Sequence, residues 1–147
     1  MYKKILVATD GSTLSKKAVR GAIGLAKSTG GSVVALYVVP RYPVSYFEGA
    51  IALDSEEISR VEQQWADKGR EVVERAQREA EAAGVQLKAV TAQSDLVAEA
   101  IVSAAKKHKC DLITMASHGR KGIKRLLLGS ETQHVLANST VPVLVLR

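Results

Sequence analysis

The stretch of sequence that decides the fold is residues 111–135, which read DLITMASHGRKGIKRLLLGSETQHV. Leu112 to Met115 is a short apolar run, which is typical of a buried strand. Small and turn-prone residues end this run at 117–119, and Gly129-Ser130 then opens a new helix. We expect Ser130 to cap that helix, because Gln133 completes the spacing of a capping box.

The glycines of this stretch predict a phosphate site. Gly119 and Gly129 mark points where the backbone either approaches another group closely or takes a positive φ. A helix N-terminus, with unpaired N–H groups and the positive end of the helix dipole, follows directly. The pattern is neither a Walker A loop nor the Gly-x-Gly-x-x-Gly that follows the first strand of dinucleotide-binding domains.

Apolar runs and helical patterns alternate along the rest of the chain. The expected strands cover residues 3–9, 32–39, 85–90, 112–115 and 142–146, and the expected helices cover 12–27, 54–83, a segment after Ser94 or Asp95 to His108, and the one opening at Ser130. This order predicts an α/β, Rossmann-like fold with a parallel sheet and helices on both faces. Ligands of such sheets lie at a switch point, so we expect Thr9-Asp10-Gly11 beside 115–119.

Several local signals define the ends of these elements. Ser12 is a good N-cap for the first helix, and Asp54 with Glu57 has capping-box spacing. A helix over 54–83 would be about 40 Å long, which exceeds the diameter of a small domain. We therefore expect a break or bend, with Gly69 as the candidate position. Residues 85–90 partly alternate between apolar and polar, which places that strand at an edge of the sheet.

Composition indicates a globular protein with one domain over 1–147. Hydrophobic residues make up 46% of the chain and charged residues 24%. No apolar run approaches the roughly 20 residues that span a bilayer, so we expect no membrane partner. The chain has one cysteine, Cys110, which excludes an internal disulfide and favours the cytoplasm.

The net charge is +6, and the basic residues are spread along the chain. Aromatic residues make up only 4%, and no strand carries the paired aromatic residues of a base-stacking platform. We therefore expect no nucleic-acid partner. The group Arg120, Lys121, Lys124 and Arg125 lies on the phosphate loop, where it either neutralises a triphosphate or remains solvated.

The histidines and the cysteine show no metal-ligand spacing. Cys110 precedes a buried strand and is expected to be inert, and His108 and His134 read as structural. His118 either contacts phosphate or ends a strand.

Residues 40–53 are irregular and rich in aromatic side chains. They form a lid, a partner surface or a packed loop.

The chain resembles the universal stress protein family from end to end. One hallmark is the opening KKILVATDGS at 3–12, and another is the C-terminal VPVLV at 141–145. Between them lies the family's nucleotide-binding pattern Gly-x2-Gly-x9-Gly-[Ser/Thr]. Its fit here is Ala116-x2-Gly119-x9-Gly129-Ser130, so alanine replaces the first glycine.

The resemblance implies a five-stranded parallel sheet of order 3-2-1-4-5, a homodimer and bound ATP accompanied by Mg²⁺. An apolar final strand at the sheet edge is a pairing hazard, so we expect the dimer to form through Val141-Leu146. The residues that the resemblance places around ATP are Ala8, Thr9, Asp10, Val38, Met115, Ala116, His118, Gly119, Gly129, Ser130, Glu131 and Thr132.

The function implied is that of a cytoplasmic, nucleotide-responsive regulator in the stress response. No convincing catalytic set is evident, so at most slow ATP hydrolysis is expected. One alternative is a dimeric interaction module that does not bind ATP, which Ala116 and the basic loop favour. Another is a true adenine-nucleotide hydrolase, whose turnover would depend on Asp10.

Overall fold

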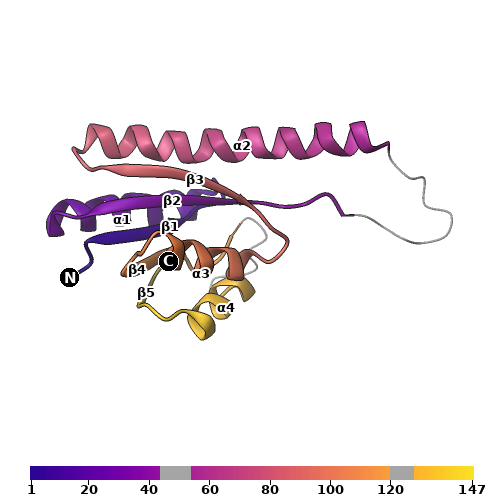
Figure 1. Ribbon diagram of the computed structural model, residues 1–147. Helices are drawn as coiled ribbons and strands as arrows, with labels where there is room; N and C mark the ends of the chain where they lie inside the picture. The colour runs from indigo at the N-terminus through magenta and orange to yellow at the C-terminus, as the bar shows by residue number, and fades with distance from the viewer. Residues whose placement is uncertain (44–53, 120–127) are drawn as a thin grey trace.

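The computed structural model describes residues 1–43, 54–119 and 128–147 of the chain. Five parallel strands form one sheet in the order β3-β2-β1-β4-β5, which confirms the order that the family resemblance implied (Figure 1). The elements are β1 (Lys4–Ala8), α1 (Thr13–Thr29), β2 (Ser32–Val39), α2 (Ser55–Ala82), β3 (Leu87–Gln93), α3 (Val97–Lys107), β4 (Leu112–Ala116), α4 (Ser130–Asn138) and β5 (Val143–Leu146).

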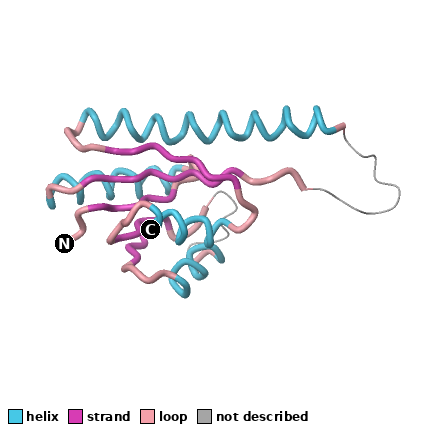
Figure 2. The backbone as a smooth tube through the Cα atoms, in the orientation of Figure 1, coloured by secondary structure: helices cyan, strands magenta, loops and turns pink. Residues whose placement is uncertain are grey.

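Two apolar clusters fill the space between the sheet and its helices. Alternate residues of a strand face opposite sides of a sheet. Ile5 and Val7 of β1 accordingly pack with α1 and α2, whereas Leu6 packs with α3 and α4. The result is a three-layer α/β fold with helices on both faces, and the backbone tube in Figure 2 shows the helical layers beside the strands.

Helix α1 begins and ends where its sequence signals predicted. The Ser12 side chain accepts a hydrogen bond from the Ser15 backbone N–H at 3.2 Å. Gly30 ends the helix with φ of 69°, a left-handed conformation that glycine adopts without a steric penalty. Asp54 likewise caps α2 by accepting from the Glu56 N–H.

The expected break at Gly69 is wrong, because α2 is one continuous helix of 28 residues. Its length is about 42 Å at 1.5 Å per residue, and Figure 1 shows its first turns extending beyond the strands. The glycine serves close packing instead. A Cβ at position 69 would lie 2.6 Å from Cδ1 of Tyr37 in β2.

The start of α3 also differs from the prediction. Its N-cap is Leu96, which forms no side-chain capping bond, and Ser94 lies just outside the helix, where its Oγ accepts from the Leu96 N–H at 3.0 Å. Strand β3 begins at Leu87 rather than Val85, because the Val85 N–H still donates to the Ala80 carbonyl at the end of α2, at 2.9 Å.

β3 and β5 are the two edge strands of the sheet. The prediction of an edge position for β3 is thus confirmed. On β5, Leu144 is 40% exposed although it is apolar.

Among the helices that the structure describes, none combines the length and the apolar character needed to cross a bilayer.

Candidate functional site

The carboxyl ends of β1 and β4 lie side by side, as the switch-point argument predicted. The two strands pair directly, with Val7 opposite Thr114. Beyond them, one carboxylate oxygen of Asp10 accepts from the Ser12 N–H at 2.9 Å. The other, Oδ2, lies so close to Gly119 that a Cβ there would be 2.7 Å away. Gly119 is therefore needed for close approach rather than for a positive φ.

Helix α4 begins at this site with a glycine at its N-cap. The N-cap is Gly129 rather than Ser130, and among the described residues no side-chain capping bond forms. The predicted capping box is wrong because Gln133 donates instead to the Leu128 carbonyl at 2.8 Å. Gly129 is held by its N–H, which donates to the Ser117 carbonyl at 2.8 Å. An uncapped helix N-terminus attracts anions.

Gly129 also permits a close backbone contact. A Cβ at this position would lie 3.3 Å from both the His118 Cα and the Ser117 carbonyl oxygen. Its φ is −59°, so a left-handed conformation is not the reason for glycine here. The segment before α4 and the end of β4 therefore pack backbone against backbone.

Thr132 fixes the first turn of α4 to the end of β4. Its side chain is 2% exposed, and its hydroxyl donates to the carbonyls of Ala116 at 3.0 Å and Ser117 at 3.2 Å. Among described residues other than glycine, only Tyr2 and Lys109 have a positive φ. Ala116 therefore carries its methyl group without backbone strain.

Glu131 is directed toward α3. Its Oε2 accepts a hydrogen bond from the Ala98 N–H at 3.2 Å. Since Leu96 does not cap α3, a carboxylate from α4 supplies the acceptor that the N-terminus of α3 lacks. This contact gives Glu131 a role other than the phosphate contact that the resemblance implied.

Two serines that the sequence analysis did not select contribute to the site. Ser15 is buried, and its Oγ lies 3.0 Å from the Thr9 Oγ1, which also accepts from the Gly11 N–H at 3.3 Å. Ser117 is buried as well, with its Oγ 3.2 Å from Nδ1 of His118. The available signal for Ser15 was a hydroxyl on the apolar face of α1, beside Ala18 and Val19.

The apolar members of the predicted set lie on one face of the sheet. Ala8, Val38 and Met115 belong to the cluster that packs with α3 and α4. They come from three adjacent strands, β1, β2 and β4. The four basic residues predicted near the phosphates, Arg120, Lys121, Lys124 and Arg125, lie outside the described residues, as do 44–53 of the segment 40–53.

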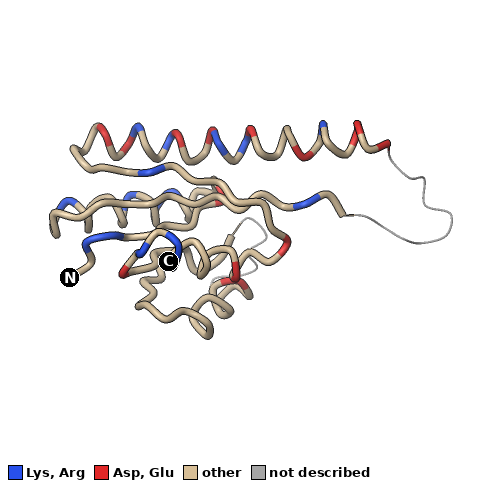
Figure 3. The backbone as a smooth tube through the Cα atoms, viewed as in Figure 1, with Lys and Arg blue, Asp and Glu red and all other residues tan. Residues whose placement is uncertain are grey.

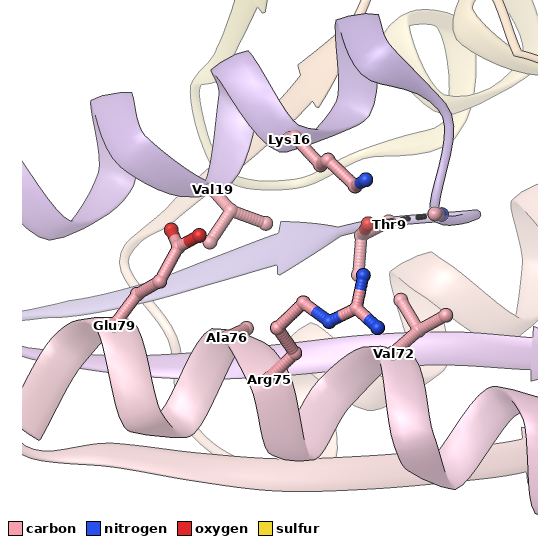
Figure 4. Close-up of a pocket in the computed structure, with 8 residues that line it drawn as sticks. Thr9, Lys16, Val19, Val72, Arg75, Ala76 and Glu79 are labelled. Carbon is pink, nitrogen blue, oxygen red and sulfur yellow. Dashed lines mark hydrogen bonds between the residues drawn. The ribbon is translucent and has the colours of Figure 1, made fainter.

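A separate groove lies on the other face, between α1 and α2 (Figure 4). Its volume is about 40 Å³, which holds one or two water molecules and not a nucleotide. Lys16 and Arg75 extend toward Thr9 from the two helices. Arg75 pairs with Glu71 at 3.1 Å, and Glu79 on the groove wall lies 3.8 Å from Arg20.

Within the described ranges, no group of three or more His, Cys, Asp or Glu side chains is placed to hold a metal ion. Burial raises the pKa of the Cys110 thiol to about 11, against the opposing positive charge of Lys4. A thiol with this pKa remains protonated at neutral pH and is a poor nucleophile.

Comparisons with known proteins place the chain among its relatives. The model of the universal stress protein family matches residues 1–147. Universal stress protein MJ0531 of Methanocaldococcus jannaschii is 37% identical over all of this chain and 83% of its own length. Universal stress protein YxiE of Bacillus subtilis is 33% identical, with both chains covered completely.

Solved structures share the same architecture. Universal stress protein UspA from Lactobacillus plantarum superposes with a TM-score of 0.84 at 25% identity, covering 99% of this chain and 98% of that one. A universal stress protein solved in complex with cAMP has a TM-score of 0.72 at 24% identity, covering 99% of this chain and 97% of its own. The chain belongs to the universal stress protein family.

Proposed function

We propose that this protein binds ATP at the switch point between β1 and β4 and acts as a nucleotide-responsive regulator in the stress response. In this proposal residues 1–147 form one cytoplasmic nucleotide-binding domain. The observation that carries it is the uncapped N-terminus of α4, which begins at Gly129 beside the close contact of Gly119 with Asp10.

The physical argument concerns the phosphates and the base separately. The first N–H groups of α4 and its dipole favour an anion, and Gly129, the N-cap, has no side chain that could compete for them. Ala8, Val38 and Met115 offer an apolar surface on the same face of the sheet for the adenine ring. Family members solved with cAMP and with dAMP support an adenine nucleotide as the ligand class.

Mg²⁺ fits this site as part of the nucleotide complex. The ion is usually held by one or two carboxylates together with substrate phosphates, and it retains several waters. Asp10 supplies a carboxylate whose Oδ2 faces Gly119. Asp10 would hold the ion, which would neutralise phosphate charge.

The experiment is calorimetric titration of Mg-ATP into the parent protein and two variants. Gly119→Asp puts a second carboxylate against Asp10 and the phosphates, so binding should be lost. Gly24→Asp is the matched control, because a Cβ at Gly24 meets nothing within 4 Å in α1. Parent binding that survives in Gly24→Asp and disappears in Gly119→Asp supports the site. Equal binding by all three proteins places the nucleotide elsewhere.

The second candidate is a dimeric interaction module that does not bind ATP. Ala116 in place of the motif glycine favours it, although Ala116 has no backbone strain. If the parent protein binds neither ATP nor another adenine nucleotide in the titration, this function replaces the first.

We also propose that the protein is a homodimer through Val141-Leu146. The support is an edge strand, β5, that leaves Leu144 40% exposed. Leu144→Lys should shift the protein to the monomer in sedimentation velocity. Leu136→Lys is the matched control, because Leu136 is a similarly exposed leucine on α4, at 43%. Identical behaviour of both variants would exclude β5 as the interface.

A further inference from the structure

Lysines from separate parts of the chain meet at the amino ends of the strands, opposite the proposed nucleotide site. We call this surface the basic edge, and it consists of Lys3, Lys4, Lys88, Lys106, Lys107 and Lys109. The first pair opens β1, Lys88 is near the start of β3, and the others immediately precede β4. Since all strands are parallel, these positions lie together at the end of the sheet where the strands begin. Figure 3 shows basic segments where β1 and β3 begin.

Two of these lysines also share a face of the sheet. Ile5 and Leu87, the neighbours of Lys4 and Lys88, pack toward α1 and α2, so both lysines lie on the α3 face. The pKa of His108, at the end of α3, is lowered by burial and then by the positive charges of Lys88, Lys107 and Lys4. Lys88, Lys107 and Lys4 therefore lie close enough to His108 to act on its charge.

No lysine of the basic edge forms an ion pair within the described part of the chain. The ion pairs there join Arg20 to Glu79, Arg70 to Asp67 and Arg75 to Glu71, and none includes these lysines. The Asp111 carboxylate instead accepts from the backbone N–H groups of Lys3 and Lys4, at 2.9 and 3.0 Å.

Local structure accounts for only part of this cluster. The Lys3 ammonium donates to the Thr29 carbonyl at the end of α1. Lys106 and Lys107 lie in the last turn of α3, where a positive charge favours the helix dipole. Lys4 and Lys88 have neither role, and bringing like charges together costs stability.

We propose that the basic edge binds an acidic polypeptide segment, a run of Asp and Glu residues on a partner protein. Ammonium groups attract such a segment over about one Debye length and accelerate its association. The six cations that define this surface are all lysines, and none is an arginine, whose planar fork nucleic-acid sites commonly use. This proposal does not rest on nucleotide binding, because the basic edge lies at the amino ends of the strands and the proposed nucleotide site lies at their carboxyl ends.

The test measures fluorescence anisotropy of a labelled decaglutamate peptide at about 20 mM and about 300 mM salt. Lys88→Glu/Lys107→Glu should weaken low-salt binding at least about tenfold, and high salt should weaken binding by the parent. The matched control is Lys17→Glu/Lys68→Glu, with the same change in charge at two exposed helix positions away from the basic edge. The control should remain within about threefold of the parent.

Three results overturn the proposal: no peptide binding by the parent, equal losses in both double variants, or tighter binding of a DNA duplex or of phosphatidylserine vesicles at the same salt concentration. Lys88→Gln/Lys107→Gln guards against misfolding, because it removes the charge without introducing a carboxylate and should give an intermediate loss. Thermal unfolding verifies that each variant is folded.

Discussion

Thr114 and Thr132 are both buried threonines, but their hydroxyl groups have different surroundings. Among the described residues, Thr114 Oγ1 is a buried side-chain atom without a hydrogen-bond partner. Thr132 Oγ1 donates to two carbonyls. Thr114→Val should stabilise the fold by about 1 kcal/mol, because it removes an unsatisfied hydroxyl at constant shape. Thr132→Val should cost about 1–3 kcal/mol. Urea unfolding measures both, and destabilisation by Thr114→Val would contradict this account.

Asp111 links stability to pH at the residue scale. Partial burial acts to raise its pKa, but hydrogen bonds from the N–H groups of Lys3 and Lys4 outweigh that effect and lower it. A carboxyl with a lowered folded pKa stabilises above its unfolded pKa, and this contribution disappears as pH falls through the folded value. The parent should therefore be more stable than Asp111→Asn near neutral pH, and their unfolding free energies should converge below about pH 4. A constant difference would exclude this linkage.

Gly69 and Gly24 provide a comparison at the scale of the helix. Both are helix glycines, and alanine in an open helix position gains up to about 1 kcal/mol. Gly24→Ala should show this gain, because nothing lies within 4 Å of the added Cβ. Gly69→Ala should destabilise, because its Cβ would meet the Tyr37 ring at 2.6 Å. If thermal unfolding shows stabilisation by both, the contact between α2 and β2 is looser than described.

The elements themselves were predictable from the sequence, whereas several of their ends were not. Apolar runs identified four of the strands, because a buried parallel strand needs apolar residues on both faces, and partial alternation identified β3. The start of α3 depends on Glu131, which lies far away in the sequence. The role of Gly69 depends on Tyr37, so no local pattern revealed it. Within the candidate site, Asp10 was predicted from its place at the end of the first strand and the glycines from their spacing, but the direction of Glu131 required the tertiary structure.

The net charge of +6 is unevenly distributed over the whole molecule. The lysines are scattered along the sequence, but the parallel strands bring those of the basic edge together where the strands begin. Their mutual repulsion should make the parent more stable as salt rises from about 20 to about 300 mM. Lys88→Gln/Lys107→Gln should reduce this dependence, as measured by thermal unfolding. An unchanged salt dependence would show that repulsion at this edge is negligible.

The buried Cys110 gives the chain an internal reporter of its own opening. Cys110 is 6% exposed as a residue, and the pKa of about 11 leaves almost none of its thiol ionised near pH 8. An alkylating reagent should therefore modify Cys110 only while the chain is transiently unfolded. The rate of alkylation then measures how often the chain opens. A ligand that binds the folded state should lower the rate of alkylation in proportion to its occupancy. Mass spectrometry can count the alkylated chains with and without Mg-ATP. The difference would measure the change in the stability of the folded state without any denaturant. Labelling as fast as that of a free thiol would contradict this account.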